Sequence, residues 1–243
     1  MIINLSFHKA LSGRRGKGNN KADTPSGVTY EQFMAMSEDD KNNIIRDIVN
    51  NSNIVVPDYL DKSATSKVMY ALGMNNKPEV VSDSALDKIK GRSLYRTVSD
   101  AKTISAMEIL DQIRYGDYTQ LSGDYKSVYG RAIYFGSSFG ASASYGGITA
   151  RMARAKLNPN TKIVSDSDLQ KMVGKNVFFQ KMPGLDDGNA DATALTALVN
   201  GIDGWKDDIS GYVMILNRKA LTFSSTSKII DAKKSWRKCT NAN

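Results

Sequence analysis

Residues 130–147 (GRAIYFGSSFGASASYGG) constrain the fold most, because they join a short apolar run to a dense series of small residues. Residues 132–135 are apolar and aromatic and are flanked by glycine on each side, which predicts a buried strand. Ser137 or Ser138 can then cap a short helix that reaches Tyr145. Small side chains let backbones approach closely. Two interpretations stay open: a tight strand-to-helix packing contact, or one wall of a pocket for a flat ligand.

The chain has the size and composition of an ordinary globular protein. It has 243 residues, of which 41% are hydrophobic and 24% charged, so it can bury a full core. No stretch approaches the ~20 apolar residues that a membrane helix needs, and we expect no membrane partner. Residues 1–5 are too short for the core of a signal peptide, and basic residues follow them. We therefore expect no secretion through a signal peptide.

Cysteine and histidine counts exclude several kinds of site. The chain has one cysteine, Cys239, and one histidine, His8, near opposite ends. Neither an internal disulfide nor a His/Cys zinc site can form within one chain. A Ser-His-Asp triad would have to recruit His8 from a segment rich in glycine and lysine. Hydrolase chemistry based on histidine is therefore disfavoured, and we predict no metal site.

Positive charge is concentrated at the two ends of the chain. Residues 1–21 carry five basic residues and no acid, and residues 219–243 carry six basic residues and Asp231. Because the total charge is +8, the intervening residues are close to neutral. Basic ends favour an acidic partner, and nucleic acid is one candidate. No aromatic residue is interleaved with the N-terminal charges, which argues against nucleic-acid contact.

Helix signals are concentrated in residues 27–77, which we predict to be a small N-terminal helical lobe. Thr29 and Gln32 have the spacing of a capping box, and Ser37 precedes three acids at the start of an apolar stripe. Residues 1–26 are rich in Gly, Asn, Lys and Arg, and they predict a flexible basic arm.

Strand and helix signals alternate irregularly through residues 78–225, which predicts the α+β class. Residues 212–216 are the most apolar run and predict a central strand. Residues 93–98 alternate as a second strand would. The remaining residues, 226–243, are predicted to form a basic C-terminal tail.

Three motifs in this order resemble the ADP-ribosyltransferase superfamily. They are LYR at residues 94–96, GRAIYF at residues 130–135 with the small-residue helix after it, and YVMILN at residues 212–217. Residues 156–160 and 201–205 are similar to segments of bacteriophage head-associated members. The resemblance implies a split β-sheet core, here extending over roughly residues 90–225.

The resemblance also implies an NAD site in a cleft between the two halves of the split sheet. The strand backbone at Arg96 would hold the nicotinamide amide, and the guanidinium would bind phosphate or ribose. Tyr134 would line the pocket, and Tyr145 would stack on the nicotinamide ring. Arg96 could instead be an ion-paired strand residue, and Tyr134 a core residue. The cofactor-binding residues implied are Arg96, Thr97, Tyr134, Phe135, Ser138 and Tyr145.

The sequence departs from the family at the residue that would stabilise the positive charge of the transition state. Active members carry a glutamate just before the late strand, where this chain has Gly211. Asp207 and Asp208 come three or four residues earlier, so Asp208 is our candidate acid beside Arg96 and Tyr134. Asp208 could instead be a solvated loop residue. We expect weak transferase activity, and we expect Gly211→Glu to raise it.

Two functional hypotheses follow from the resemblance. The first is an NAD-dependent mono-ADP-ribosyltransferase-like phage protein that modifies a protein target with weakened catalysis. The second is a catalytically degenerate structural or packaged virion protein that uses the same fold and its basic arms to dock partners. Both place the protein in a virion or in the host cytoplasm. A nucleic-acid accessory protein that acts through the basic tails is a third alternative.

Overall fold

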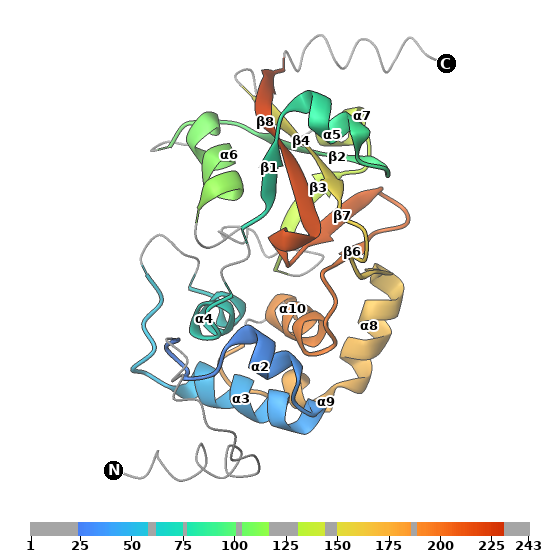
Figure 1. Cartoon of the computed structure of the whole chain (residues 1–243). Helices are drawn as coiled ribbons and strands as arrows, with labels where there is room; N and C mark the ends of the chain where they lie inside the picture. The colour runs from blue at the N-terminus through green and yellow to red at the C-terminus, as the bar shows by residue number, and fades with distance from the viewer. Residues whose placement is uncertain are drawn as a thin grey trace.

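Eight strands form one open mixed sheet in the described part of this computed structural model, in the order β1-β8-β4-β2-β3-β7-β6-β5 (Figure 1). The structure describes residues 24–57, 62–74, 77–100, 104–116, 131–143, 150–185 and 189–230. The strands are β1 Glu79–Val81, β2 Ser93–Val98, β3 Ile133–Gly136, β4 Arg151–Leu157, β5 Ile163–Ser165, β6 Gly204–Lys206, β7 Tyr212–Ile215 and β8 Leu221–Ile229. Helices pack around this sheet, which confirms the α+β class.

The sheet is nearly divided between β2 and β3. Strand β2 pairs with β4 over its whole length, and β3 pairs with β7 over its whole length. Between β2 and β3 the register contains a single residue pair, Tyr95 with Gly136. Two half-sheets therefore meet at one point, β1-β8-β4-β2 on one side and β3-β7-β6-β5 on the other. We call this junction the split.

The helices begin where the sequence places polar caps. They are α2 Tyr30–Met34, α3 Glu38–Asn50, α4 Ala64–Ala71, α5 Asp83–Lys88, α6 Ala106–Tyr115, α7 Phe139–Ala143, α8 Asp166–Lys175, α9 Val177–Gln180 and α10 Ala190–Val199, with a 3₁₀ turn at Arg218–Ala220. Thr29 and Gln32 form the predicted capping box, and Ser37 caps α3. These caps satisfy backbone N–H groups that a helix start leaves without partners.

Helices α2, α3 and α4 share one hydrophobic core with α8, α9 and α10. This helical core extends from Phe33 and Ile45 to Leu195. It also includes Trp205 and Met214 from the half-sheet β3-β7-β6-β5. All ten residues of α10 are buried, so this helix needs apolar neighbours on every side. The predicted boundary at residue 77 therefore does not separate two hydrophobic cores, and the N-terminal helices complete the fold of the later half of the chain (Figure 1).

A second core lies between the two half-sheets and α6. It contains Leu94 from β2, Phe135 from β3, Val213 from β7 and Phe223 from β8, with Leu110 from α6. Its residues alternate with those of the helical core along β3 and β7, as the period of a strand requires. Both half-sheets thus contribute one face to this sheet core.

The ends of the fold differ slightly from the predicted tails. Ser26 donates from its backbone N–H and its hydroxyl to the Ala71 carbonyl, at 3.1 and 2.6 Å, so residues 24–26 belong to the body. Strand β8 continues through Ile229, so residues 226–229 extend a strand that the sequence predicts to end earlier. The rest of both predicted tails, residues 1–23 and 231–243, lies outside the described residues. No helix among the described residues combines the length and the apolar character needed to span a membrane.

Candidate functional site

Arg96 connects the two half-sheets at the split. It follows Tyr95, the residue of β2 that is paired with β3, and its Nη1 donates a 3.0 Å hydrogen bond to the Tyr134 carbonyl of β3. Thr97 and Val98, the two residues of β2 that follow Arg96, have no register partner in β3. The Arg96 side chain therefore lies where the two strands stop pairing.

The hydrogen-bonding capacity of Arg96 is only partly used. The residue is half-buried, and its buried Nε has no hydrogen-bond partner. Within the described residues, its guanidinium forms no ion pair. Burial lowers the pKa of the guanidinium, and the nearby Tyr134 opposes that shift. A buried donor without an acceptor is costly, so this arrangement suits an anionic ligand that would accept from the guanidinium edge.

Helix α7 packs tightly against the same part of β2 and β3. The hydroxyls of Thr97 and Ser142 lie 2.8 Å apart, and both side chains are buried. A Cβ added to Gly136 would lie 2.6 Å from the Ser142 backbone nitrogen, so this contact requires glycine. Ser138, not Ser137, caps α7 by accepting from the Ala141 N–H at 3.1 Å. The packing interpretation of the small-residue segment is therefore realised here.

The aromatic residues implied by the resemblance have different surroundings. The Tyr134 ring packs against the helical core and stays half-buried. Phe135 is buried in the sheet core, with its ring centroid 5.8 Å from that of Phe223, so it packs β3 against β8. Tyr145 lies outside the described residues. Arg96, Thr97, Tyr134 and Phe135 are thus neighbours on β2 and β3, but their side chains have different surroundings: Arg96 reaches the Tyr134 carbonyl, Thr97 bonds to α7 and Phe135 lies in the sheet core. Ser138 is exposed at the start of α7.

Gly211 lies beside the end of β3. Its carbonyl accepts a 3.0 Å hydrogen bond from the Ser137 N–H. Its φ of +73° is in the left-handed region, and an added Cβ would lie 2.9 Å from the Ser137 hydroxyl oxygen. Glutamate would therefore be strained at this position, so Gly211→Glu would carry a cost in stability that the sequence does not reveal.

Both acids proposed as substitutes make contacts within the turn between β6 and β7. Asp207 is 8% exposed, and its carboxylate accepts from the N–H groups of Ile209 and Ser210 at 3.2 and 2.9 Å. The exposed Asp208 pairs with Lys206 at 3.0 Å. These contacts match the interpretation of Asp208 as a loop acid, and a different turn conformation would be needed for catalysis.

Two features of this region were missed from the sequence. Ser142 meets Thr97 across 45 positions, and no sequence pattern marks that contact. Asp166 begins α8 at the end of β5, which pairs with β6. Burial raises the pKa of Asp166, the Gln170 amide lowers it, and the charge of Asp207 raises it further. Sequence reading could place neither acid beside the other, because strand order is not visible in it.

The residues that the structure describes contain no group of three or more His, Cys, Asp or Glu side chains that could hold a metal ion. The candidate site is therefore an arginine at a break in a sheet, bordered by hydroxyls, an aromatic residue and a glycine turn. A search of protein-family models, of curated proteins and of solved structures found no match to this chain.

Proposed function

We propose that this chain has an ADP-ribosyltransferase-like fold, binds NAD at the split, and transfers ADP-ribose to a protein target with weakened catalysis. One observation carries the proposal: β2 and β3 are joined by one residue pair, and a half-satisfied arginine follows that pair directly. The motif resemblance places the NAD cleft at the corresponding position.

The groups at the split match the chemical parts of NAD. The planar guanidinium of Arg96 can bind the diphosphate through two parallel hydrogen bonds, and its unpaired Nε supplies one of those donors. Thr97 pairs with Met152 of β4 and with no residue of β3, so the side of β2 that faces away from β4 is open to the nicotinamide carboxamide at this point. The hydroxyl of Thr97 is already bonded to Ser142, so this contact would come from the backbone.

Catalysis is the weaker half of the proposal. Loss of nicotinamide leaves a positively charged, oxocarbenium-like ribose, and a carboxylate beside it stabilises that charge. Gly211 has no side chain, and Asp207 and Asp208 are engaged in their own turn. Losing one electrostatic contact of this kind typically costs about 10²–10³ in rate. We therefore propose that this chain still binds NAD but no longer turns it over efficiently.

Calorimetric titration with NAD tests the binding step. Arg96→Ala should weaken binding roughly 10-fold to 100-fold, because a hydrogen bond to a charged group contributes about 1.5–3 kcal/mol. Arg154→Ala on the neighbouring strand β4 is the matched control, since its guanidinium pairs with Asp83 and Asp87. No NAD binding by the native chain, or equal binding by Arg96→Ala, would contradict the proposal.

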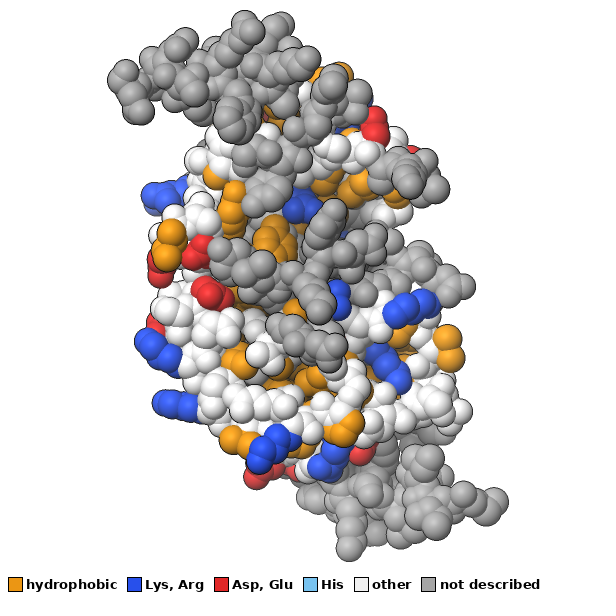
Figure 2. Space-filling model, turned by 180° about the vertical axis from the view of Figure 1, so that it is seen from behind, with side chains coloured by type: hydrophobic (Ala, Val, Ile, Leu, Met, Phe, Trp, Pro, Cys, Tyr) orange, Lys and Arg blue, Asp and Glu red, His pale blue; other side chains and the backbone are white. Residues whose placement is uncertain are grey.

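The second candidate is a virion structural or packaged protein that keeps the fold without transfer activity. The contacts of Asp207 and Asp208 favour it, because neither carboxylate is free within the turn. Incubation with labelled NAD and host extract separates the two candidates: NAD binding without labelled protein selects the structural protein. For nucleic acid the support is weaker. Among the described residues visible in Figure 2, Lys and Arg side chains are spread among neutral and apolar ones and form no continuous stripe.

A further inference from the structure

The far end of β8 is an open sheet edge. Strand β1 pairs with β8 only at residues 222–224, although β8 continues to Ile229. On its other side, β8 is paired with β4 through residues 227–229. No described strand pairs with residues 227–229 on the β1 side, so part of their backbone is available to another strand. This free length equals that of β1 and β5, which both pair stably within the sheet.

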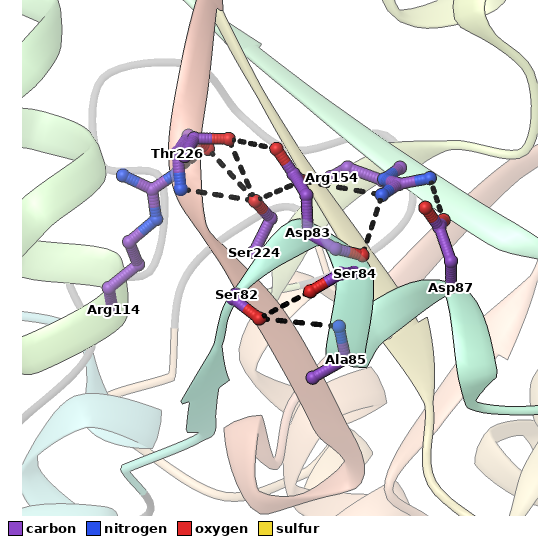
Figure 3. A network of polar contacts seen from close by, with 9 residues as sticks. All are labelled: Ser82, Asp83, Ser84, Ala85, Asp87, Arg114, Arg154, Ser224 and Thr226. Atoms are coloured by element: carbon purple, nitrogen blue, oxygen red, sulfur yellow. Dashed lines mark hydrogen bonds and ion pairs between the residues drawn. The ribbon is translucent and has the colours of Figure 1, made fainter.

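Exposed apolar side chains accompany the open edge. Ile229 is 72% exposed, and Met107 on α6 is 40% exposed. The Ser227 hydroxyl lies 3.5 Å from the Met107 sulfur, so Ser227 faces α6, and Ile229, two residues later, faces the same side. Nearer β1, the edge is closed, because Arg114 donates to the Thr226 carbonyl (Figure 3). An open edge beside exposed apolar groups can accept an added strand.

We propose that residues 2–7 of a second copy of this chain bind the open edge of β8 as an added strand. These residues read IINLSF, in which Ile3, Leu5 and Phe7 alternate with Asn4 and Ser6. That period of two gives a strand one apolar face, which would pack on Met107 and Ile229. Neither the fold nor the proposed NAD site accounts for this apolar segment at the start of a basic arm.

The length of the arm favours a second copy over the same chain. Ser26 is bonded to α4, whereas β8 runs away from α4 toward the opposite end of the molecule (Figure 1). Residues 8–23 can span at most ~55 Å when fully extended, at about 3.4 Å per residue. A folded chain of 243 residues has a radius of gyration of about 18 Å, or a diameter of roughly 45 Å, so reaching its own edge from the opposite end would use most of the length of the arm. A second copy has no such constraint.

The two contacting surfaces differ, so the proposed association is head-to-tail. Each copy would donate its arm to one neighbour and accept an arm from another, which forms rings or chains. This arrangement predicts complementation between two defective variants. Ile3→Asp with Leu5→Asp removes the apolar face of the arm, and Met107→Asp with Ile229→Asp removes the apolar surface beside β8.

Sedimentation velocity of the full-length chain over a range of concentrations tests the proposal. We expect native chains to associate and either double variant alone to associate at least tenfold more weakly. An equimolar mixture should form heterodimers and nothing larger, because only one arm–edge contact remains. Val55→Asp, at an apolar residue that is 73% exposed elsewhere, should associate like the native chain.

Three results would overturn the proposal. Native chains that stay monomeric at high micromolar concentration would show that the edge and the arm do not bind. A mixture of the two double variants that stays monomeric would show that they are not complementary surfaces. Loss of association in Val55→Asp equal to that in the edge variant would show that β8 has no special role. None of these results bears on NAD binding.

Discussion

Arg96 and Arg154 lie on neighbouring strands and have opposite surroundings. In the register of β2 and β4, Arg154 is opposite Tyr95, one residue before Arg96. Arg154 pairs with Asp87 at 2.6 Å and with Asp83 at 3.3 Å. Among the described residues, Arg96 has one neutral carbonyl as its hydrogen-bond partner, and its Nε has none. The same residue type is thus used twice, once within a completed polar network and once with unused donors.

The network around Arg154 ties α5 to two strands. Asp83 accepts hydrogen bonds from the hydroxyls of Ser224 and Thr226, each at 2.6 Å, in addition to its ion pair (Figure 3). The hydrogen bond that Arg154 donates to Asp87 is the main cause that raises the pKa of Arg154, whereas burial lowers the pKa of Arg96. A satisfied network stabilises one geometry, and an under-satisfied cation suits a ligand. This contrast explains why we assign binding to Arg96.

A third arginine, Arg218, has a purely structural environment. Arg218 is fully buried and donates to the carbonyls of Gln112, Ile113 and Gly116, at distances of 3.1, 2.8 and 2.8 Å. We expect Arg218→Ala to lower the free energy of unfolding by about 3–5 kcal/mol, because it removes a fully buried side chain and the donor of the Ile113 and Gly116 carbonyls, whereas the Gln112 carbonyl keeps the Gly116 N–H. Urea denaturation measures this change. Exposed Lys219→Ala is the control, and an equal loss in both variants would refute this role.

Gly211 provides the next largest effect, at the edge of the split. Because its φ is +73° and its Cα faces Ser137, we expect Gly211→Glu to cost about 1–3 kcal/mol of stability. Adding Ser137→Ala removes the contacting hydroxyl and should recover part of that loss. Thermal unfolding of both variants tests this, and the double variant is the better background for measuring transferase activity. A single variant as stable as the native chain would show that the turn rearranges easily.

The network around Asp83 should make the free energy of unfolding depend on pH in the acid range. Hydrogen bonds from Ser224 and Thr226, then that from Arg154, lower the pKa of Asp83 below its usual 3.8. Its contribution to stability is therefore present above about pH 4 and is lost as the pH falls through the folded pKa. The side chain is 43% exposed, so we expect at most about 1 kcal/mol.

Comparing native and Asp83→Asn unfolding at about pH 6 and about pH 3 measures the contribution of Asp83. The two proteins should differ at the higher pH and converge at the lower one. Asp47→Asn, at an exposed residue of α3, controls for the loss of one surface charge. A difference that stays constant with pH would mean that the carboxylate charge of Asp83 is not responsible.

Local sequence signals predicted many of the helices and strands, but they could not predict the long-range contacts between them. Thr29 and Ser37 cap helices as expected, because capping depends on residues three positions apart. The shared helical core could not be predicted, because it joins α3 to α10 across more than a hundred positions. A separate N-terminal lobe was the natural prediction from a helical segment seen alone.

The candidate site shows the same division. Arg96 and Tyr134 could be chosen from their motifs, and the structure places them in contact. The left-handed backbone of Gly211 was hidden, because a glycine at a turn can adopt several conformations. The contacts of Asp207 and Asp208 depend on how the turn between β6 and β7 closes. Sequence therefore indicated the arginine that we propose to bind NAD more readily than it located an acid.

The smallest expected change sharpens the contrast between Arg96 and Arg154. Arg96→Met keeps a similar volume, removes a buried Nε without a partner, and gives up the hydrogen bond to the Tyr134 carbonyl. The loss of that hydrogen bond and the relief of one buried unpaired donor are each about 1–3 kcal/mol, so they should nearly cancel. We expect the free energy of unfolding to change by less than about 0.5 kcal/mol, while NAD binding is lost. Denaturant unfolding and calorimetry on the same sample measure both quantities. A loss of stability above about 2 kcal/mol would instead identify Arg96 as a brace that holds the half-sheets together.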